Sequence, residues 1–153
     1  MAADAMLGSL ARKLRAMGFD VFYFKEGEDR ALISLCLDQG RTLLTSDRAL
    51  FSIASRRKVN AILVQGRTDS ERISSMARSA ESDRSPLVPG LSRCSLCNGR
   101  LEKVPRPLAG GLPPPGVLVR HRDFFRCVAC GRIYWKGSHW KKLMSMKRRL
   151  ALG

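Results

Sequence analysis

The sequence predicts an α/β protein: a parallel sheet covered by helices, followed by a small β-rich module that contains cysteines. Helix and strand patterns alternate through residues 1–85, and two Cys-x2-Cys pairs follow residue 91. Between them, Pro86, Pro89 and Gly90 interrupt the pattern, which indicates a domain boundary. At 153 residues the chain can form a core of about 90 residues plus one small module. We therefore expect domains at 1–85 and 91–143, with a basic tail at 144–153.

The first element is an amphipathic helix over about residues 6–17. Apolar residues recur there at spacings of three and four, namely Leu7, Leu10, Leu14 and Met17. Gly18 follows as a C-cap. The aromatic and β-branched run 20–24 then predicts a strand.

The remaining segments of the first domain continue the alternation. Helical spacing at 28–39, 48–58 and 69–81 alternates with apolar runs at 41–46 and 60–66. Because parallel strands need crossover connections, this order predicts a parallel sheet covered by helices. Such a fold normally starts with a strand, but only three residues precede Asp4. We expect the leading strand to be either very short or absent from this sequence. The Pro- and Gly-rich segment 104–116 predicts a loop in the second module.

The positive charge is concentrated in the second module. Residues 1–90 hold 14 Lys and Arg against 11 Asp and Glu, a net +3, and residues 91–153 hold 14 against 2, a net +12, which together give +15. This favours a polyanionic partner, with RNA first, an anionic membrane surface second, and a general solubilising role as the alternative. No run of about 18 uncharged apolar residues occurs. We expect a soluble, cytoplasmic protein that does not bind membranes, with unknown protein partners.

Four of the five cysteines have the spacing of a metal site. Cys94 and Cys97 form one pair, Cys127 and Cys130 the other, and 29 residues separate the pairs. Four thiolates at this spacing predict a structural zinc ion of the ribbon type, which leaves no open position for substrate. Disulfides and a redox-active pair are the alternatives. Cys36 lies on the apolar face of a predicted helix, and we therefore expect it to be a core residue.

Four acids follow the predicted strands or begin the predicted helices: Asp4, Asp29, Asp47 and Asp69. The carboxyl ends of parallel strands share one edge, so these carboxylates are expected to converge there. Carboxylate oxygens suit Mg²⁺ or Mn²⁺, which favours phosphodiester hydrolysis. As alternatives, Asp4 and Asp69 cap helices and Asp29 is a first-turn acid. Glu26 and Glu28 could replace Asp29.

Four stretches together resemble the Mut-7 C-terminal RNase domain family: "DAMLGSLARKLRAMGFDVFYF", "GRTLLTSDRAL", "RCSLCNGRL" and "FFRCVACGRIYWKGSHWKKL". The resemblance covers about residues 4–143. It implies a PIN-like three-layer α/β/α sandwich followed by a zinc ribbon, and a metal-dependent ribonuclease activity.

The resemblance also implies roles for individual residues. Asp4, Asp29 and Asp47 would hold Mg²⁺ or Mn²⁺, Arg48 would contact the scissile phosphate, and Asp69 would be an auxiliary acid. Ten basic and aromatic side chains are expected to bind RNA: Arg12, Lys13, Arg126, Arg132, Trp135, Lys136, His139, Trp140, Lys141 and Lys142. Of these, Trp135, Trp140 and His139 could equally pack on the ribbon.

The sequence thus favours a metal-dependent ribonuclease whose zinc ribbon binds RNA. The alternative is a catalytically inactive nucleic-acid-binding adaptor with a PIN-like domain, and a third reading is a ribbon module that binds proteins. Only the first requires metal-dependent turnover, and only the third predicts weak binding to naked RNA.

Overall fold

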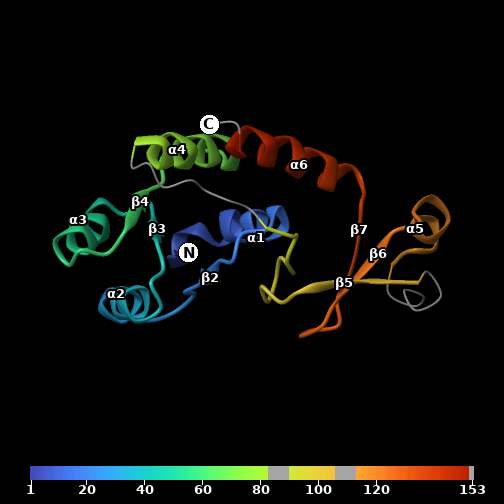
Figure 1. The fold of residues 1–153 in the computed structure, drawn as a ribbon, viewed down its shortest axis with the longest axis horizontal. Helices are drawn as coiled ribbons and strands as arrows, with labels where there is room; N and C mark the ends of the chain where they lie inside the picture. The colour runs from blue at the N-terminus through green and yellow to red at the C-terminus, as the bar shows by residue number, and fades with distance from the viewer. Residues whose placement is uncertain (83–89, 106–112, 152–153) are drawn as a thin grey trace.

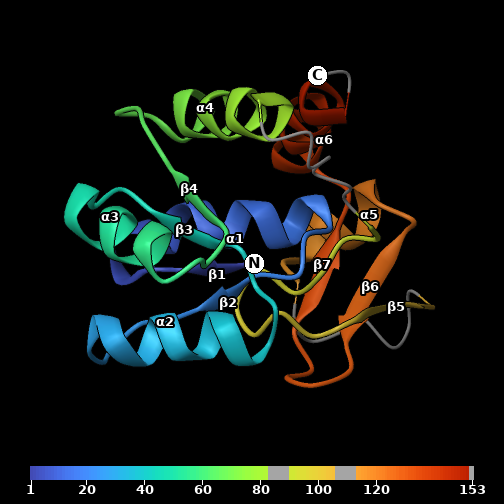
Figure 2. The ribbon, with the colours of Figure 1, turned by 60° about the vertical axis from the view of Figure 1, so that its left-hand side comes forward.

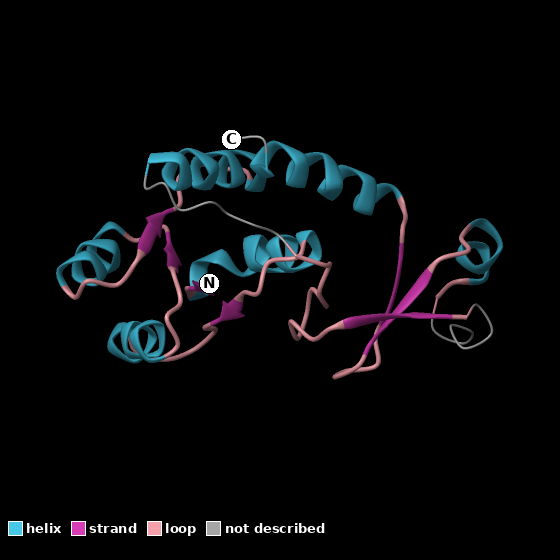
Figure 3. Ribbon diagram, viewed as in Figure 1, coloured by secondary structure: helices cyan, strands magenta, loops and turns pink. Residues whose placement is uncertain are grey.

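The computed structural model describes residues 1–82, 90–105 and 113–151 (Figure 1). The first part contains β1 (Ala2–Ala3), the 3₁₀ helix η1 (Ala5–Leu7), α1 (Gly8–Met17), β2 (Phe22–Tyr23), α2 (Asp29–Asp38), β3 (Leu43–Thr45), α3 (Arg48–Arg56), β4 (Ala61–Leu63) and α4 (Asp69–Ser82). The second part contains β5 (Leu101–Val104), α5 (Pro115–Arg120), β6 (Phe124–Cys127), β7 (Ile133–Trp135) and α6 (Ser138–Ala151), as Figure 3 shows.

The leading strand is present and very short. β1 lies inside a parallel sheet of order β2-β1-β3-β4 and pairs with both β2 and β3. The Ala2 amide donates to the Thr42 carbonyl at 2.8 Å, and the Phe22 amide donates to the Met1 carbonyl at 3.0 Å. Two alanines therefore suffice to place Asp4 at the carboxyl end of an inner strand.

Helices cover both faces of this sheet, which gives three layers. Along β1 and β3 successive side chains point to opposite faces, as the pleat of a strand requires. Ala2 and Leu43 pack with α2 and α3, whereas Ala3 and Leu44 pack with α1 and α4. Figure 2 shows α2 and α4 on opposite sides of the sheet. The predicted α/β class with a parallel sheet is confirmed.

The second part is built on an antiparallel sheet of order β5-β6-β7. Phe124 is fully buried and Ile133 is 8% exposed, and α5 covers them with Val117 and Leu118. A core this small needs an additional constraint, which a metal site can supply.

The C-terminal segment, which the sequence suggested as a basic tail, forms the helix α6. α6 packs against α1 and α4. Its apolar residues Leu143, Met144 and Met146 contact the core on that face of the parallel sheet. Basic residues flank these positions on both sides and obscured the amphipathic pattern. Residues 83–89 at the predicted boundary and residues 106–112 of the predicted 104–116 loop lie outside the described residues, so the division at 1–85 and 91–143 stays a prediction.

The two parts also meet at the end of α1. Gly18 caps this helix as predicted, with φ 107°, and a Cβ there would lie 2.1 Å from the Gly90 carbonyl oxygen. Only glycine allows this approach in this backbone conformation. The Gly90 amide donates to the Gly18 carbonyl at 3.1 Å. None of the helices within the described ranges is both long and apolar enough to cross a membrane.

Candidate active site and metal centre

Asp4 and Asp47 follow neighbouring strands at one edge of the parallel sheet. Asp4 comes directly after β1, and Asp47 lies two residues beyond β3. Asp4 is 6% exposed, and its Oδ1 accepts a hydrogen bond from the Met6 amide at 2.9 Å. It therefore caps η1, as the capping alternative predicts, and it still lies at the edge that the catalytic prediction requires.

Thr45, which the sequence analysis did not single out, connects these two acids. Its hydroxyl donates to Oδ2 of Asp4 and accepts from the Asp47 amide, the latter at 2.9 Å. Thr45 is fully buried, and a polar residue at a buried strand end is the signal that could have revealed it. The threonine fixes the Asp4 carboxylate relative to the backbone of Asp47.

Asp47 is exposed and combines two of the roles considered for it. Its Oδ1 accepts from the amides of Ala49 at 2.6 Å and Leu50 at 3.2 Å, so it is the N-cap of α3. Its Oδ2 accepts no hydrogen bond from the described part of the chain and is available to a cation. Arg48, the first residue of α3, is also exposed.

Asp29 is the first residue of α2 and is exposed, which matches the first-turn alternative. It lines a hollow between α2 and α3, with Ile33 and Arg57. Glu26 and Glu28 are exposed on the preceding loop, and Glu26 pairs with Lys25 at 3.1 Å. Within the described residues, the acids do not form a group as close as the cysteine cluster below. Their role as metal ligands stays a prediction.

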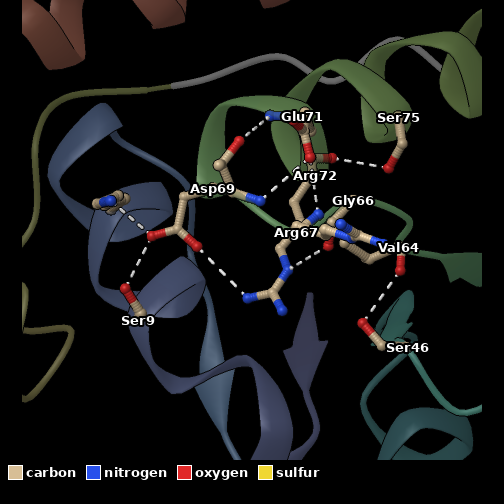
Figure 4. Close-up of polar contacts among 11 residues, drawn as sticks. Ser9, Ser46, Val64, Gly66, Arg67, Asp69, Glu71, Arg72 and Ser75 are labelled. Atoms are coloured by element: carbon tan, nitrogen blue, oxygen red, sulfur yellow. Dashed lines mark hydrogen bonds and ion pairs between the residues drawn. The ribbon is translucent and has the colours of Figure 1, made fainter.

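Asp69 joins α4 to α1 (Figure 4). Its Oδ2 lies 2.5 Å from Lys13 Nζ and accepts from the Ser9 hydroxyl at 2.8 Å, and its Oδ1 lies 3.5 Å from Arg72. Burial raises the pKa of Asp69, but the bonds from Lys13 and Ser9 outweigh it and bring the pKa below its usual value. Two of the predicted site residues, Asp69 and Lys13, thus neutralise each other.

Asp69 is not the N-cap of α4, which corrects one of the alternatives. The Thr68 hydroxyl accepts from the Glu71 amide at 3.3 Å, and Glu71 accepts from the amides of Arg67 and Thr68 at 2.7 and 3.2 Å. This reciprocal pair is a capping box. Threonine followed three residues later by glutamate is the sequence signal for it.

The four predicted zinc ligands come together. The sulfur atoms of Cys94, Cys97, Cys127 and Cys130 all lie within 4.8 Å of one another. Cys94 and Cys130 are 3.6 Å apart, and Cys97 and Cys127 are 3.4 Å apart. A tetrahedral zinc ion with Zn–S bonds of about 2.3 Å separates its sulfurs by about 3.8 Å. The four side chains therefore fit zinc.

Both cysteine pairs sit in turns of the same form. Asn98 follows Cys97 with φ 67°, and Gly131 follows Cys130 with φ 72°. In the first pair an asparagine rather than a glycine adopts the left-handed conformation, which this side chain tolerates. Burial raises the pKa of the Cys94 thiol, yet the amides of Cys97 and Leu96 and the Tyr134 hydroxyl bring it to about 6.

Arg15 attaches the first cysteine turn to α1. It is 6% exposed and donates to the carbonyls of Val21 at 2.8 Å, Ser95 at 3.2 Å and Leu96 at 2.6 Å. Asn98 adds bonds to Val21 and Asp20. Arg15 was not predicted, because basic residues on a helix normally face solvent.

The predicted RNA-binding residues are spread over both parts. Those that are exposed include Arg12 on α1, Arg126 and Arg132 on the ribbon, and His139, Lys141 and Lys142 on α6. Trp135 packs with Phe124 in the small core beneath α5, so the packing alternative describes its place in the structure. Lys136 and Trp140 line a separate cavity.

A family model described as Mut7-C RNAse domain matches residues 1–147. Neither the curated proteins nor the solved structures include a match to this chain.

Proposed function

Since this chain belongs to the Mut7-C RNase domain family, we propose that it is a divalent-metal-dependent ribonuclease with a PIN-like catalytic domain and an RNA-binding zinc ribbon. The observation that carries the proposal is the arrangement of Asp4, Thr45 and Asp47. One buried hydroxyl links the Asp4 carboxylate to the backbone amide of Asp47, and within the described residues one carboxylate oxygen of Asp47 accepts no hydrogen bond.

In this proposal Asp4, Asp29 and Asp47 hold Mg²⁺ or Mn²⁺. When bound, the ion supplies an activated water and stabilises the charge that develops on the phosphodiester. Thr45 keeps the Asp4 carboxylate in one orientation, and Arg48 contacts the phosphate. Asp69, proposed from the sequence as an auxiliary acid, acts through Lys13 and Ser9 by holding α1 against α4.

The ribbon supplies the electrostatic part of RNA binding. Its four cysteines hold structural zinc, and the module carries the +12 share of the charge. Each phosphate that these cations neutralise releases counterions, so binding is expected to weaken steeply with salt.

The test is cleavage of a labelled single-stranded RNA by wild type and Asp47→Asn, with and without added Mn²⁺. Asparagine still caps a helix, so the variant loses the charge and keeps the fold. We expect cleavage only by wild type with Mn²⁺. Asp38→Asn, which changes an exposed acid at the end of α2, is the matched control and should cleave normally.

Equal cleavage by wild type and Asp47→Asn would contradict the catalytic assignment. Salt-dependent RNA binding without any cleavage would favour the inactive adaptor. The structure is compatible with that alternative, because both carboxylate oxygens of Asp4 already accept hydrogen bonds from the protein. Weak binding to RNA would favour the protein-binding reading.

A further inference from the structure

A cavity of about 360 Å³ lies where the ribbon meets α1 and α6. Ala16 of α1, Gly90 and the following residues, the ribbon strands and α6 contribute to it. Its lining is largely apolar, and the main side chains are Phe125, Tyr134, Lys136, Trp140, Met144 and Lys147. Pockets of this size accept one flat ring system.

The ribbon sheet separates its aromatic residues into two sets. Phe125 is paired with Tyr134 across β6 and β7, and both line the cavity. The next pair, Phe124 and Trp135, belongs to the opposite face, in the core beneath α5. Strand alternation thus assigns one aromatic pair to the core of the module and leaves the other at an open cavity.

Cations surround the aromatic surface. Lys136 Nζ lies 5.5 Å from the ring centre of Phe125 and 5.3 Å from that of Trp140. Lys147 donates to the Gly90 carbonyl at 2.8 Å, and Arg93 is also part of the lining. Within the described residues, the lining contains no acidic side chain. The cavity therefore combines ring faces with a purely positive edge.

We propose that this cavity binds one unpaired base of an RNA strand. The base stacks on Trp140 or the neighbouring rings, and its flanking phosphates pair with Lys136 and Lys147. Stacking on aromatic side chains together with basic groups is the usual mode of single-strand binding, since every base has a π face. The positive edge matches a phosphodiester backbone. This inference rests on the proposed function, because it assumes an RNA ligand.

The first experiment uses fluorescence of the zinc-loaded full chain. Only Trp135 and Trp140 occur, so Trp135→Phe leaves Trp140 as the single reporter and Trp140→Phe leaves Trp135. Single-stranded oligouridine is added without Mg²⁺ or Mn²⁺, in the Asp47→Asn background, so that the strand stays intact. We expect quenching of Trp140 and no change at Trp135. Binding that leaves Trp140 unquenched would overturn the proposal.

The second experiment measures affinity by anisotropy. Trp140→Ala should weaken single-strand binding roughly tenfold or more, whereas Trp140→Phe, which retains a ring, should stay within a few fold of wild type. Lys136→Gln should weaken binding more than Lys142→Gln, which removes the same charge from an exposed position on α6 outside the cavity. Blunt duplex RNA, whose bases are stacked internally, should be insensitive to Trp140→Ala.

Zinc content and circular dichroism identify any variant that fails to fold. If Trp140→Ala does not fold, the quenching of Trp140 decides whether the cavity binds a base. Unchanged affinity of folded Trp140→Ala would refute the cavity as the base site. The two proposals can fail separately. Trp140-dependent binding without cleavage would reject the nuclease and keep the base site, whereas cleavage with Trp140-independent binding would do the reverse.

Discussion

The hydroxyl of Thr45 donates a hydrogen bond to the Asp4 carboxylate, across the junction between β3 and β1. The same oxygen accepts from the Asp47 amide. One buried side chain thus relates two acids that are 43 positions apart in the sequence (47 minus 4). If Asp4 and Asp47 act together, Thr45 determines their relative position.

Replacing this hydroxyl tests that relationship. Thr45→Val keeps the shape but leaves a buried carboxylate oxygen and the Asp47 amide without partners, which should cost about 1–3 kcal/mol of unfolding free energy. We expect it to raise the Mn²⁺ concentration needed for half-maximal RNA cleavage. Thr45→Ser, which restores the hydroxyl, should recover most of both losses. If Thr45→Val reached half-maximal RNA cleavage at the same Mn²⁺ concentration as wild type, Thr45 would have no positioning role.

Zinc should hold the ribbon together. We expect one zinc ion per chain by elemental analysis, and we expect Cys127→Ser to lose it together with the ordered ribbon, because four thiolates complete the tetrahedron and the local core is small. The control is Cys36→Ala, which removes the one cysteine buried between α2 and the sheet. That variant should lose stability but keep the full zinc content. Zinc retained in Cys127→Ser would rule out this ligand set.

Arg15 should link the stability of the two parts. Arg15→Met leaves three carbonyls without a charged donor, and since hydrogen bonds to charged groups contribute roughly 1.5–3 kcal/mol each, the free energy of unfolding in urea should fall by roughly 4 kcal/mol or more. Zinc release to a competing chelator should also become faster, because Ser95 and Leu96 lie within the first cysteine turn. The exposed neighbour substitution Arg12→Met should change neither quantity. If Arg15→Met released zinc at the wild-type rate, the contact between Arg15 and the cysteine turn would not contribute to zinc retention.

The Asp69 carboxylate predicts a pH dependence of stability. Its pKa in the folded chain lies below the ordinary 3.8, so the contacts with Lys13 and Ser9 stabilise the fold above that pH, and this contribution is lost as the pH falls through the folded pKa. Asp69→Asn should lose about 1 kcal/mol at neutral pH and converge on wild type as the pH falls through the folded pKa of Asp69. The measurement is urea unfolding across this range. Normal RNA cleavage by the variant would assign Asp69 a purely structural role, and a constant stability difference at all pH values would contradict the ion pair.

Local sequence patterns predicted most of the secondary structure and the zinc ligands. The helix Gly8–Met17 follows from the spacing of its leucines, and the four cysteines were recognised by their spacing alone. Both signals are local in the sequence. A helix face is defined by residues three or four apart, and the two cysteines of one turn are three residues apart.

The sequence alone thus determined the α/β class, the positions of the acids after the strands, the four cysteines that cluster and the basic second part. The tertiary structure decided the rest: the pairing of a two-residue strand, the hydroxyl of Thr45 between two acids, the burial of Arg15 against a cysteine turn, and the packing of α6 on α1 and α4. These features join segments tens of residues apart. Only packing brings such segments together, and therefore no local pattern in the sequence encodes them.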